Sequence, residues 1–275
     1  MQFAAVSWNL FHGRDFPPDP ALFTWRSRLL RVTERNETHV QVNRDLRGEF
    51  ATMLAAAEWD VALLQECPPR FAAPLAEACG AGPHRVLTSR NSLAALRALA
   101  ARLNPDLIAS AEGGSNLTLV REDGPLGPIV ERRELAIHEG RPERRAMAFT
   151  RTASGVCIAN LHATNDQPRL AAADVLKAAQ AATGWAGEAP LLFGGDLNLR
   201  PGRDPSVFEE LGSRFDLAGT TDAEAIDHLL SRGLDVASPS IAWPPERREL
   251  PCGRRALRLS DHAPIAASFA TRASG

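Results

Sequence analysis

The stretch LLFGGDLNLRPG, residues 191–202, places two polar side chains directly after an apolar run. The apolar residues predict a buried β-strand, and the two glycines that follow let the backbone turn tightly. Asp196 and Asn198 come next. Because a buried carboxylate costs several kcal/mol unless a partner compensates it, Asp196 must face a structural partner or a cation with its substrate.

Further apolar runs predict strands over 3–10, 61–65, 116–120, 146–152, 156–161 and 265–269, besides 191–194. Helical patterns cover 44–57, 92–103, 169–185 and 207–211. Residues 147–161 predict a hairpin around Ala153-Ser-Gly155. Since strands and helices alternate without a strict βαβ rhythm, we expect a mixed sheet covered by helices. With no repeat and no linker, residues 1–275 are expected to form one domain.

The composition is that of an ordinary globular protein, with 44% hydrophobic and 23% charged residues in 275. The formal net charge of −2 gives no overall basic field of the kind typical of nucleic-acid binding proteins. The four cysteines are scattered without a C-x-x-C motif, and the chain starts without a signal-peptide pattern. No apolar run reaches membrane-spanning length. We therefore expect a cytoplasmic protein with reduced thiols and no integral membrane segment.

Polar groups end or follow several predicted strands. They occur in SWN at Asn9, LLQE at Glu66, NLHA at His162, GGDLN at Asp196 and Asn198, IDHLL at Asp227, and SDHAPI at Asp261 and His262. Taken singly, Asn9 could close a turn, Glu66 could be an exposed acid, and His162 could be a core histidine. Taken as an ordered set, these groups predict one cleft.

Oxygen donors dominate this set, which contains no thiolate and therefore favours Mg²⁺ or Mn²⁺ over zinc. Glu66, helped by Asn9, would hold such an ion. Hydrolysis of a phosphate ester also needs a positioned water and donors for the developing negative charge. Asp196 can orient or deprotonate the water, and Asn198 can donate its amide to phosphoryl oxygens. His262 can act as acid, base or charge stabiliser, with Asp227 fixing its tautomer.

These pieces, in this order, resemble the endonuclease/exonuclease/phosphatase superfamily with its DNase I-like fold. The resemblance runs from Ser7 to about Phe269. It implies a four-layered α/β sandwich of two packed mixed β-sheets flanked by helices, and divalent-metal phosphoester hydrolysis. It places metal binding on Asn9, Glu66 and Asp261. It places water activation and phosphate stabilisation on Asp196 and Asn198, and catalytic histidines at His162 and His262, the latter paired with Asp227.

Three features set this chain apart within that superfamily. The interval between Asn9 and Glu66 is long, so residues 14–43 are interpreted as an insertion. The chain has no tyrosine, which argues against the abasic-site endonuclease activity of one branch. Glu112 is a candidate for the acid that orients the first histidine in the DNase-like branch.

The substrate is expected first to be DNA or RNA. Two arginine-rich segments, 14–43 and 244–258, would lie beside the cleft, and arginine suits bidentate phosphate contacts. Arg144 or Arg145 is either a further phosphate contact or part of a surface salt bridge. Aromatic residues make up 6% of the chain, so no stacking platform for bases is evident.

Two alternatives stay open. A phosphomonoesterase or lipid phosphodiesterase, of the inositol-phosphate or sphingomyelin type, could use the same site. A lipid enzyme would need an exposed apolar loop, for which Phe11, Phe16, Phe23 and Trp25 are the sequence indication. A binding module that has lost catalysis is the third interpretation, disfavoured because the polar set is intact. No obligate protein partner is indicated.

Overall fold

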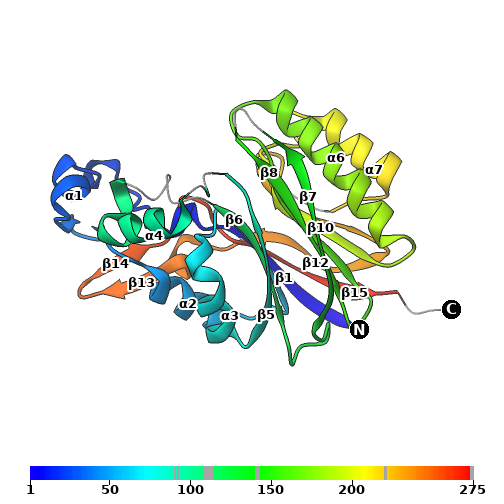
Figure 1. The fold of residues 1–275 in the computed structure, drawn as a ribbon, viewed down its shortest axis with the longest axis horizontal. Helices are drawn as coiled ribbons and strands as arrows, with labels where there is room; N and C mark the ends of the chain where they lie inside the picture. The colour runs from blue at the N-terminus through cyan, green and yellow to red at the C-terminus, as the bar shows by residue number, and fades with distance from the viewer. Residues whose placement is uncertain (90, 92, 108–113, 140–142, 220–221, 273–275) are drawn as a thin grey trace.

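Two β-sheets lie face to face at the centre of the molecule, with helices on both outer faces (Figure 1). The computed structural model describes residues 1–275 except 90, 92, 108–113, 140–142, 220–221 and 273–275. The six-stranded sheet has the order β12-β15-β1-β4-β6-β5, and the five-stranded sheet has the order β11-β10-β9-β8-β7. Both sheets mix parallel and antiparallel pairs, as the hairpin in the sequence predicted.

The strands of the first sheet are β1 (Gln2–Asn9), β4 (Val61–Gln65), β5 (Ala81–Leu87), β6 (Ser115–Arg121), β12 (Leu234–Ala242) and β15 (Ile265–Thr271). Those of the second are β7 (Ile129–His138), β8 (Arg145–Thr152), β9 (Cys157–His162), β10 (Leu191–Asp196) and β11 (Asp227–Arg232). Apolar side chains from both sheets meet between them, among them Phe3, Leu63, Ile158 and Leu192. This interface is the central core.

Helices α2 (Arg47–Ala56) and α3 (Ala72–Cys79) cover the outer face of the six-stranded sheet, where Phe50 and Phe71 pack near Trp8. Helices α6 (Pro168–Ala186) and α7 (Pro205–Phe215) cover the outer face of the five-stranded sheet. The alanine-rich inner face of α6 lets it lie close to that sheet. The result is the expected sandwich of four layers, helix, sheet, sheet and helix.

Pairing of the strands brings the polar groups to one edge. β1 and β4 run parallel with Asn9 opposite Gln65, and β9 and β10 run parallel with His162 opposite Asp196. β11 is antiparallel to β10, so its first residue, Asp227, lies opposite Asp196. Because parallel strands end at the same edge of a sheet, the predicted convergence follows from topology.

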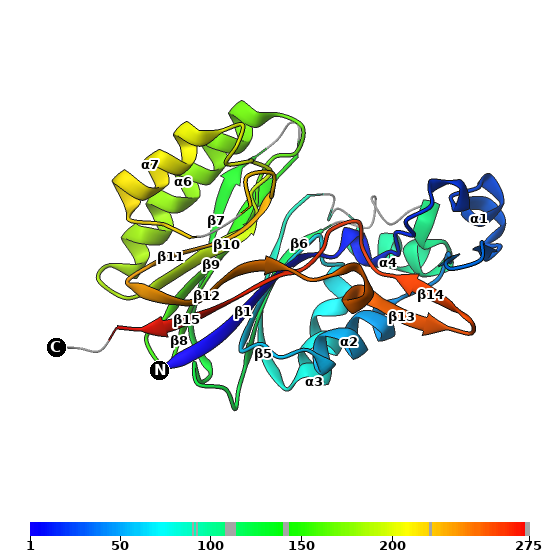
Figure 2. The ribbon, with the colours of Figure 1, turned by 180° about the vertical axis from the view of Figure 1, so that it is seen from behind.

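The remaining elements form a lobe at one end of the sandwich, seen on the left in Figure 1 and on the right in Figure 2. We call residues 14–43, 94–107 and 244–259 the lobe. It contains α1 (Trp25–Leu30), β2 (Glu34–Arg35), β3 (Val40–Gln41), α4 (Ala94–Leu103), β13 (Glu249–Cys252) and β14 (Arg255–Arg258). Short 3-10 turns lie at Phe11–Gly13, Pro20–Leu22, Pro69–Phe71 and Pro245–Arg248.

The two arginine-rich segments therefore pair with each other. Single β-bridges join Asp15 to Leu259 and His39 to Ala256. Several of their arginines make internal contacts, such as Arg255 with the Asn36 carbonyl and Arg258 with Glu249. In the described part of the chain, every helix is too short or too polar to span a bilayer.

Candidate active site

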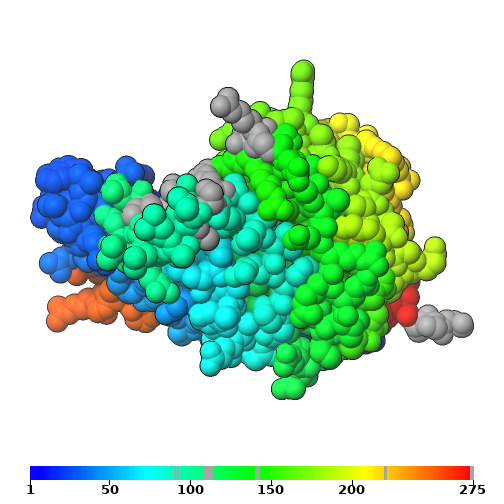
Figure 3. Space-filling view, in the orientation of Figure 1, coloured from blue at the N-terminus to red at the C-terminus, as the bar shows by residue number. Residues whose placement is uncertain are grey.

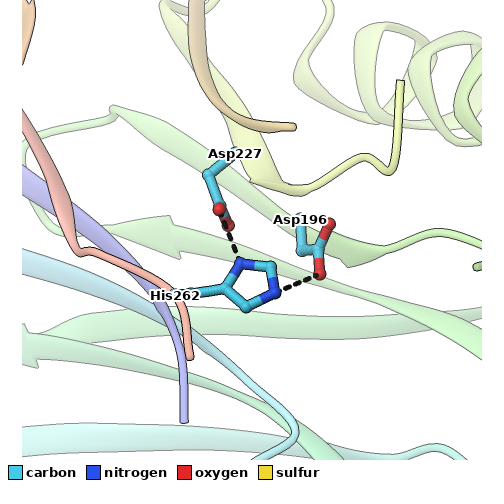
Figure 4. A group of neighbouring side chains, drawn as sticks. All are labelled: Asp196, Asp227 and His262. Carbon is cyan, nitrogen blue, oxygen red and sulfur yellow. Dashed lines mark hydrogen bonds and ion pairs between the residues drawn. The ribbon is translucent and has the colours of Figure 1, made fainter. Parts of the chain in front are cut away.

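Asp196, Asp227 and His262 meet at the edge where β10 ends and β11 begins (Figure 4). Asp227 Oδ2 lies 2.8 Å from His262 Nδ1, and Asp196 Oδ2 lies 3.9 Å from His262 Nε2. His262 comes from the segment before β15, close to β1, where Trp8 Nε1 donates to its carbonyl oxygen. One imidazole thus lies between two carboxylates, as expected for Asp227 and His262 from the sequence.

Asp196 is almost completely buried, with 1% of its surface exposed. Asn9 Nδ2 donates to its Oδ2 at 2.9 Å, across the two sheets, and the Asn198 backbone N–H donates to its Oδ1 at 3.2 Å. The pKa of Asp196 is raised to about 7 because of burial and the negative charge of Asp227, although His262 and Asn9 oppose the rise. Its main polar neighbour in the described structure is therefore Asn9, with no arginine paired to it.

His262 has the opposite electrostatic character. Burial by itself lowers the pKa of His262, but the carboxylates of Asp227, Asp196 and Asp261 raise it to about 10. The imidazole consequently carries a positive charge across neutral pH. Because both ring nitrogens are then donors, Nδ1 donates to Asp227 and Nε2 points toward Asp196.

His162 lies on the other side of Asp196, with its Nε2 3.5 Å from Asp196 Oδ2. Burial and the adjacent Arg145 cation lower the pKa of His162 well below its usual value, so its ring is neutral. Arg145 Nη1 lies 3.1 Å from His162 Nδ1. As the guanidinium only donates, Nδ1 accepts and the proton resides on Nε2, toward the cleft.

Glu66 follows β4 in a left-handed backbone conformation with φ of 46°. Its carboxylate lies 3.3 Å from His12 Nε2 and 4.0 Å from His162 Nε2. Burial and the negative charge of Asp261 raise the pKa of Glu66. Asp261 is exposed at the rim. The carboxylates of Glu66 and Asp261 therefore repel each other, and a bound divalent cation would reduce this repulsion.

Asn198 lies at the site but is tied to the backbone. The backbone φ of Asn198 is 52°, and its side-chain Nδ2 donates to the Ala163 carbonyl oxygen at 3.1 Å. One amide hydrogen and the side-chain oxygen of Asn198 remain for other partners. The asparagine is thus positioned beside Asp196, in keeping with the phosphate contact expected for it.

A polar pocket of about 340 Å³ opens next to these groups. Its described lining is His12, Glu66, Thr88, Ser89, Gly114, Glu143, Arg145, His162, Thr164, Asn165, Asp166 and Gln167. Among these residues there is no phenylalanine or tryptophan. Of the two arginines predicted as phosphate contacts, Arg145 lines the pocket and Arg144 does not. Arg145 Nη2 also lies 3.7 Å from Glu143 Oε2. Glu112 lies outside the described residues.

The sequence reasoning missed His12 and the residues 88–89 and 164–167 of the pocket. His12 follows the β1 strand end by three residues, which is a faint signal. It turns back toward Glu66 because Phe11 and His12 both have positive φ, 47° and 52°. Such a conformation is uncommon for non-glycine residues and is not readable from residue type.

Two groups of side chains could hold a divalent ion. Ligand atoms of Asp196, Asp227 and His262 lie within 4.8 Å of one another. In this group, however, His262 Nδ1 is already hydrogen-bonded to Asp227. Glu66, Asp261 and Asn9 instead offer hard oxygen donors of the kind that Mg²⁺ and Mn²⁺ prefer.

Comparison with known proteins places this geometry in context. Residues 6–262 match the profile of the endonuclease/exonuclease/phosphatase family. A solved structure of a protein of that family from Bacteroides thetaiotaomicron superposes with a TM-score of 0.65 at 15% identity, covering 99% of both chains. The mannosyl-6-phosphatase Bt3783 of Bacteroides thetaiotaomicron gives 0.64 at 15% identity, covering 97% of this chain and 98% of that one.

A truncated TDP2 from Caenorhabditis elegans gives a TM-score of 0.55 at 16% identity and covers 98% of both chains. Among curated proteins, no sequence matches this chain. At such low identities the superpositions show a shared fold, while the profile match extends over nearly the whole chain.

Proposed function

This chain belongs to the endonuclease/exonuclease/phosphatase family, and we propose that it is a divalent-metal-dependent hydrolase of small, polar phosphoesters. The observation that carries the proposal is the buried Asp196 between an asparagine donor, a neutral imidazole and a positively charged imidazole. A base with a pKa near the working pH, surrounded by donors for a phosphoryl group, suits attack of water on phosphorus.

Asp196 acts as the base in this proposal. Its pKa of about 7 means that it can accept a proton from water at neutral pH and release it afterwards. Asn9 and the Asn198 backbone N–H fix its two oxygens, so the carboxylate is held in one orientation. Orientation of the attacking water is a large part of what such a site contributes.

His262, His162 and Arg145 supply positive charge and donors for the phosphoryl oxygens. His262 is held as a cation by Asp227, and His162 presents its Nε2 proton because Arg145 occupies the acceptor Nδ1. Glu66, Asp261 and Asn9 would hold Mg²⁺ or Mn²⁺. Such an ion, when bound, stabilises negative charge on the ester and its leaving group.

The pocket favours a compact, hydroxyl-rich substrate. Thr88, Ser89, Thr164, Asn165 and Gln167 offer hydroxyl and amide groups that can hydrogen-bond a polyol. Phenylalanine and tryptophan, the larger platforms for stacked bases, are lacking among the described lining residues. The mannosyl-6-phosphatase named above shares this fold, and a sugar phosphate is a fitting first probe.

Nuclease activity, the first expectation from the sequence, stays a prediction. It relied on the arginines of 14–43 and 244–258. Arg248 donates to the Ser260 carbonyl, and Arg258 pairs with Glu249. Arg247 lies over the Trp243 ring. These contacts leave fewer arginines of the lobe to follow a nucleic-acid backbone, so the smaller substrate is the better-supported candidate.

The test is a hydrolysis panel with Mg²⁺ or Mn²⁺, with and without a chelator. Mannose 6-phosphate, p-nitrophenyl phosphate, bis-p-nitrophenyl phosphate and supercoiled plasmid serve as substrates. Asp196→Asn and His262→Gln should each lower kcat by about 10²-fold or more while the circular-dichroism spectrum is kept. His39→Gln is the matched control, because His39 also bonds to a carboxylate, Glu249, at 3.0 Å but lies in the lobe.

Chelator-sensitive release of phosphate from the monoesters, lost in both site variants and kept in His39→Gln, would support the proposal. Turnover of plasmid alone would restore the nuclease prediction. Activity that persists in Asp196→Asn would contradict the assignment of the base.

A further inference from the structure

Helix α4 presents its largest apolar side chains to water. Leu96, Leu99 and Leu103 are 63%, 55% and 64% exposed, and their spacing puts them on one helix face. Ala101, on another face, is fully buried. A surface helix usually buries its leucines and exposes its small or polar residues, so α4 carries an apolar face that the described protein does not cover.

Helix α1 extends this surface. Trp25, Leu29 and Leu30 are 65%, 56% and 62% exposed. The two helices adjoin, because Asn104 Nδ2 at the end of α4 donates to the Arg28 carbonyl in α1 at 2.8 Å. In Figure 3 the blue surface of α1 and the green-cyan surface of α4 lie side by side.

We call the six side chains Trp25, Leu29, Leu30, Leu96, Leu99 and Leu103 the apolar patch. Single exposed leucines are common, but two adjoining helices that each expose three large apolar side chains mark an interaction surface.

Five arginines belong to the two helices and the cap of the first. Arg26 and Arg28 lie in α1, Arg31 caps it, and Arg97 and Arg102 lie in α4. Neither helix contains an aspartate or glutamate. Basic helices with tryptophan and leucine on the exposed side bind at the surface of anionic membranes. We propose that the apolar patch and its arginines dock this protein onto a bilayer that contains anionic phospholipids.

Two other occupants fit less well. In a two-fold contact with a second copy, the same patch would meet itself, bringing five arginines against five others. A nucleic acid would use the arginines but leave the six large apolar side chains in water. A bilayer accommodates both, because acyl chains take up leucine and tryptophan while lipid phosphates lie at the level of the guanidinium groups.

The apolar patch adjoins the pocket through a short connection. Thr88 and Ser89 line the pocket, and α4 begins a few residues later. Asn91 Nδ2 donates to the carbonyl oxygens of Thr88, Ser89 and Gly114 at 3.3, 2.9 and 3.0 Å. Docking would therefore hold the pocket beside the headgroup layer. Docking of this kind does not depend on the proposed hydrolysis.

The experiment is vesicle co-sedimentation of the full chain, with tryptophan fluorescence as a second readout. Vesicles of phosphatidylcholine alone are compared with vesicles in which one third of the lipid is phosphatidylserine. Trp25 is 65% exposed, whereas Trp8, Trp59 and Trp243 are buried. Its emission should shift to the blue on the phosphatidylserine vesicles. Binding should weaken with added salt, since the arginines contribute to it.

The variant Leu96→Glu combined with Leu99→Glu should bind these vesicles at least about tenfold more weakly. Val130→Glu is the matched control, since Val130 is 59% exposed on the edge strand β7, away from the lobe. Thermal unfolding should be nearly unchanged in both, because the replaced side chains face water.

Several results would overturn the proposal. One is equal sedimentation of wild type with and without vesicles. Another is full vesicle binding by the double variant. A third is a concentration-dependent dimer of the wild type that disappears in the double variant, which would assign the apolar patch to self-association. Salt-sensitive binding of plasmid that the double variant loses would assign it to nucleic acid.

Discussion

The sandwich and the lobe are stabilised by different interactions. Between the sheets, side chains such as Phe3, Leu63 and Leu192 are buried without polar partners and contribute through removal of apolar area from water. In the lobe, polar side chains such as Asp15, Gln41 and Asp106 are buried alongside apolar ones such as Val42 and Leu257. The lobe thus adds hydrogen bonds and ion pairs to the apolar contacts of its interior, while several large apolar side chains, Trp25 among them, lie outside.

This difference affects how each region tolerates change. Apolar packing between strands fails when backbones are forced apart. A polar interior fails when a charge state changes or a partner is removed. The contrast leads to three tests, from the largest expected effect to the smallest.

The largest effect is expected in the sandwich, at the glycine that precedes the proposed base. Gly195 has φ of +125°, and a Cβ there would overlap the Leu161 carbonyl oxygen of the neighbouring strand β9. Gly195→Ala should lower the free energy of unfolding by more than about 4 kcal/mol, because backbone strain and a clash with a main chain add. Urea unfolding, or loss of soluble protein, measures it.

Gly80→Ala is the control for backbone conformation alone. Gly80 also has positive φ, +59°, but a Cβ there meets nothing within 4 Å. Its cost should be about 1 kcal/mol. If both variants lose the same stability, the close approach of β9 and β10 is not what requires Gly195.

The second test concerns a charge inside the lobe. Asp15 is fully buried, and its Oδ2 accepts from the Val42 N–H at 3.0 Å, while Oδ1 has no hydrogen-bond partner among the described residues. Burial and the negative charge of Asp106 raise the pKa of Asp15 to about 7 against the opposing Val42 hydrogen bond. The carboxyl is therefore protonated in the folded protein well above the pH where it ionises in the unfolded chain.

Proton linkage determines whether Asp15 makes the protein more or less stable as the pH rises. Between about pH 4 and pH 7 the folded state holds a proton that the unfolded state has released, so Asp15 makes stability fall as pH rises through this window. The loss approaches roughly 4 kcal/mol at most. Asp15→Asn should remove this dependence, as urea unfolding at pH 5 and pH 8 would reveal. Asp19→Asn is the control and should leave the difference between pH 5 and pH 8 unchanged, since a hydrogen bond from Asn36 lowers the pKa of Asp19 and confines its titration to more acidic pH. If the pH dependence of stability is the same in Asp15→Asn as in the wild type, the raised pKa of Asp15 would be contradicted.

Sequence patterns predicted the sandwich better than the lobe for a physical reason. A strand buried on both faces, such as β4, is a plain apolar run, and its predicted bounds of 61–65 agree with the structure. The edge strand β7 has the sequence IVERRELAIH and was missed, because its half-exposed charged residues hide the alternation. β12 is an edge strand with mostly exposed residues and was missed as well.

The candidate site was predictable to the extent that topology fixes it. Asn9, His162 and Asp196 end strands that the sequence predicts, and parallel pairing places those ends together. His12 depends on a left-handed turn, which a residue pattern does not reveal. Arg145 was named together with Arg144, and only the structure places Arg145, not Arg144, in the pocket lining. The outward leucines of α4 were not foreseen, since helical periodicity specifies a face but not the direction in which it points.

The third test, with the smallest expected effect, compares the loss of stability when a half-buried ion pair in the lobe is removed with the loss when an exposed ion pair on the sandwich is removed. Glu249 accepts from Arg258 Nε at 2.7 Å and lies 3.0 Å from His39 Nε2, with 16% of its side chain exposed. Burial raises the pKa of Glu249, but the hydrogen bonds from His39 and Arg258 outweigh it and lower the pKa. The stability that this carboxylate contributes is therefore present above its unfolded pKa and is lost as pH falls through the lower folded value.

Glu249→Gln should cost about 1–2 kcal/mol at pH 7, as charge-assisted hydrogen bonds at a partly buried site are lost, and less in acid. Glu210→Gln on α7 breaks an exposed pair with Arg214, 2.8 Å apart, and should cost at most about 0.5 kcal/mol because water screens it. Urea unfolding of the two variants at pH 7 and pH 4 measures both. Equal losses of unfolding free energy in the two variants would mean that water screens the Glu249 ion pair as strongly as the exposed pair on α7. The buried polar contacts would then not distinguish the lobe from the sandwich.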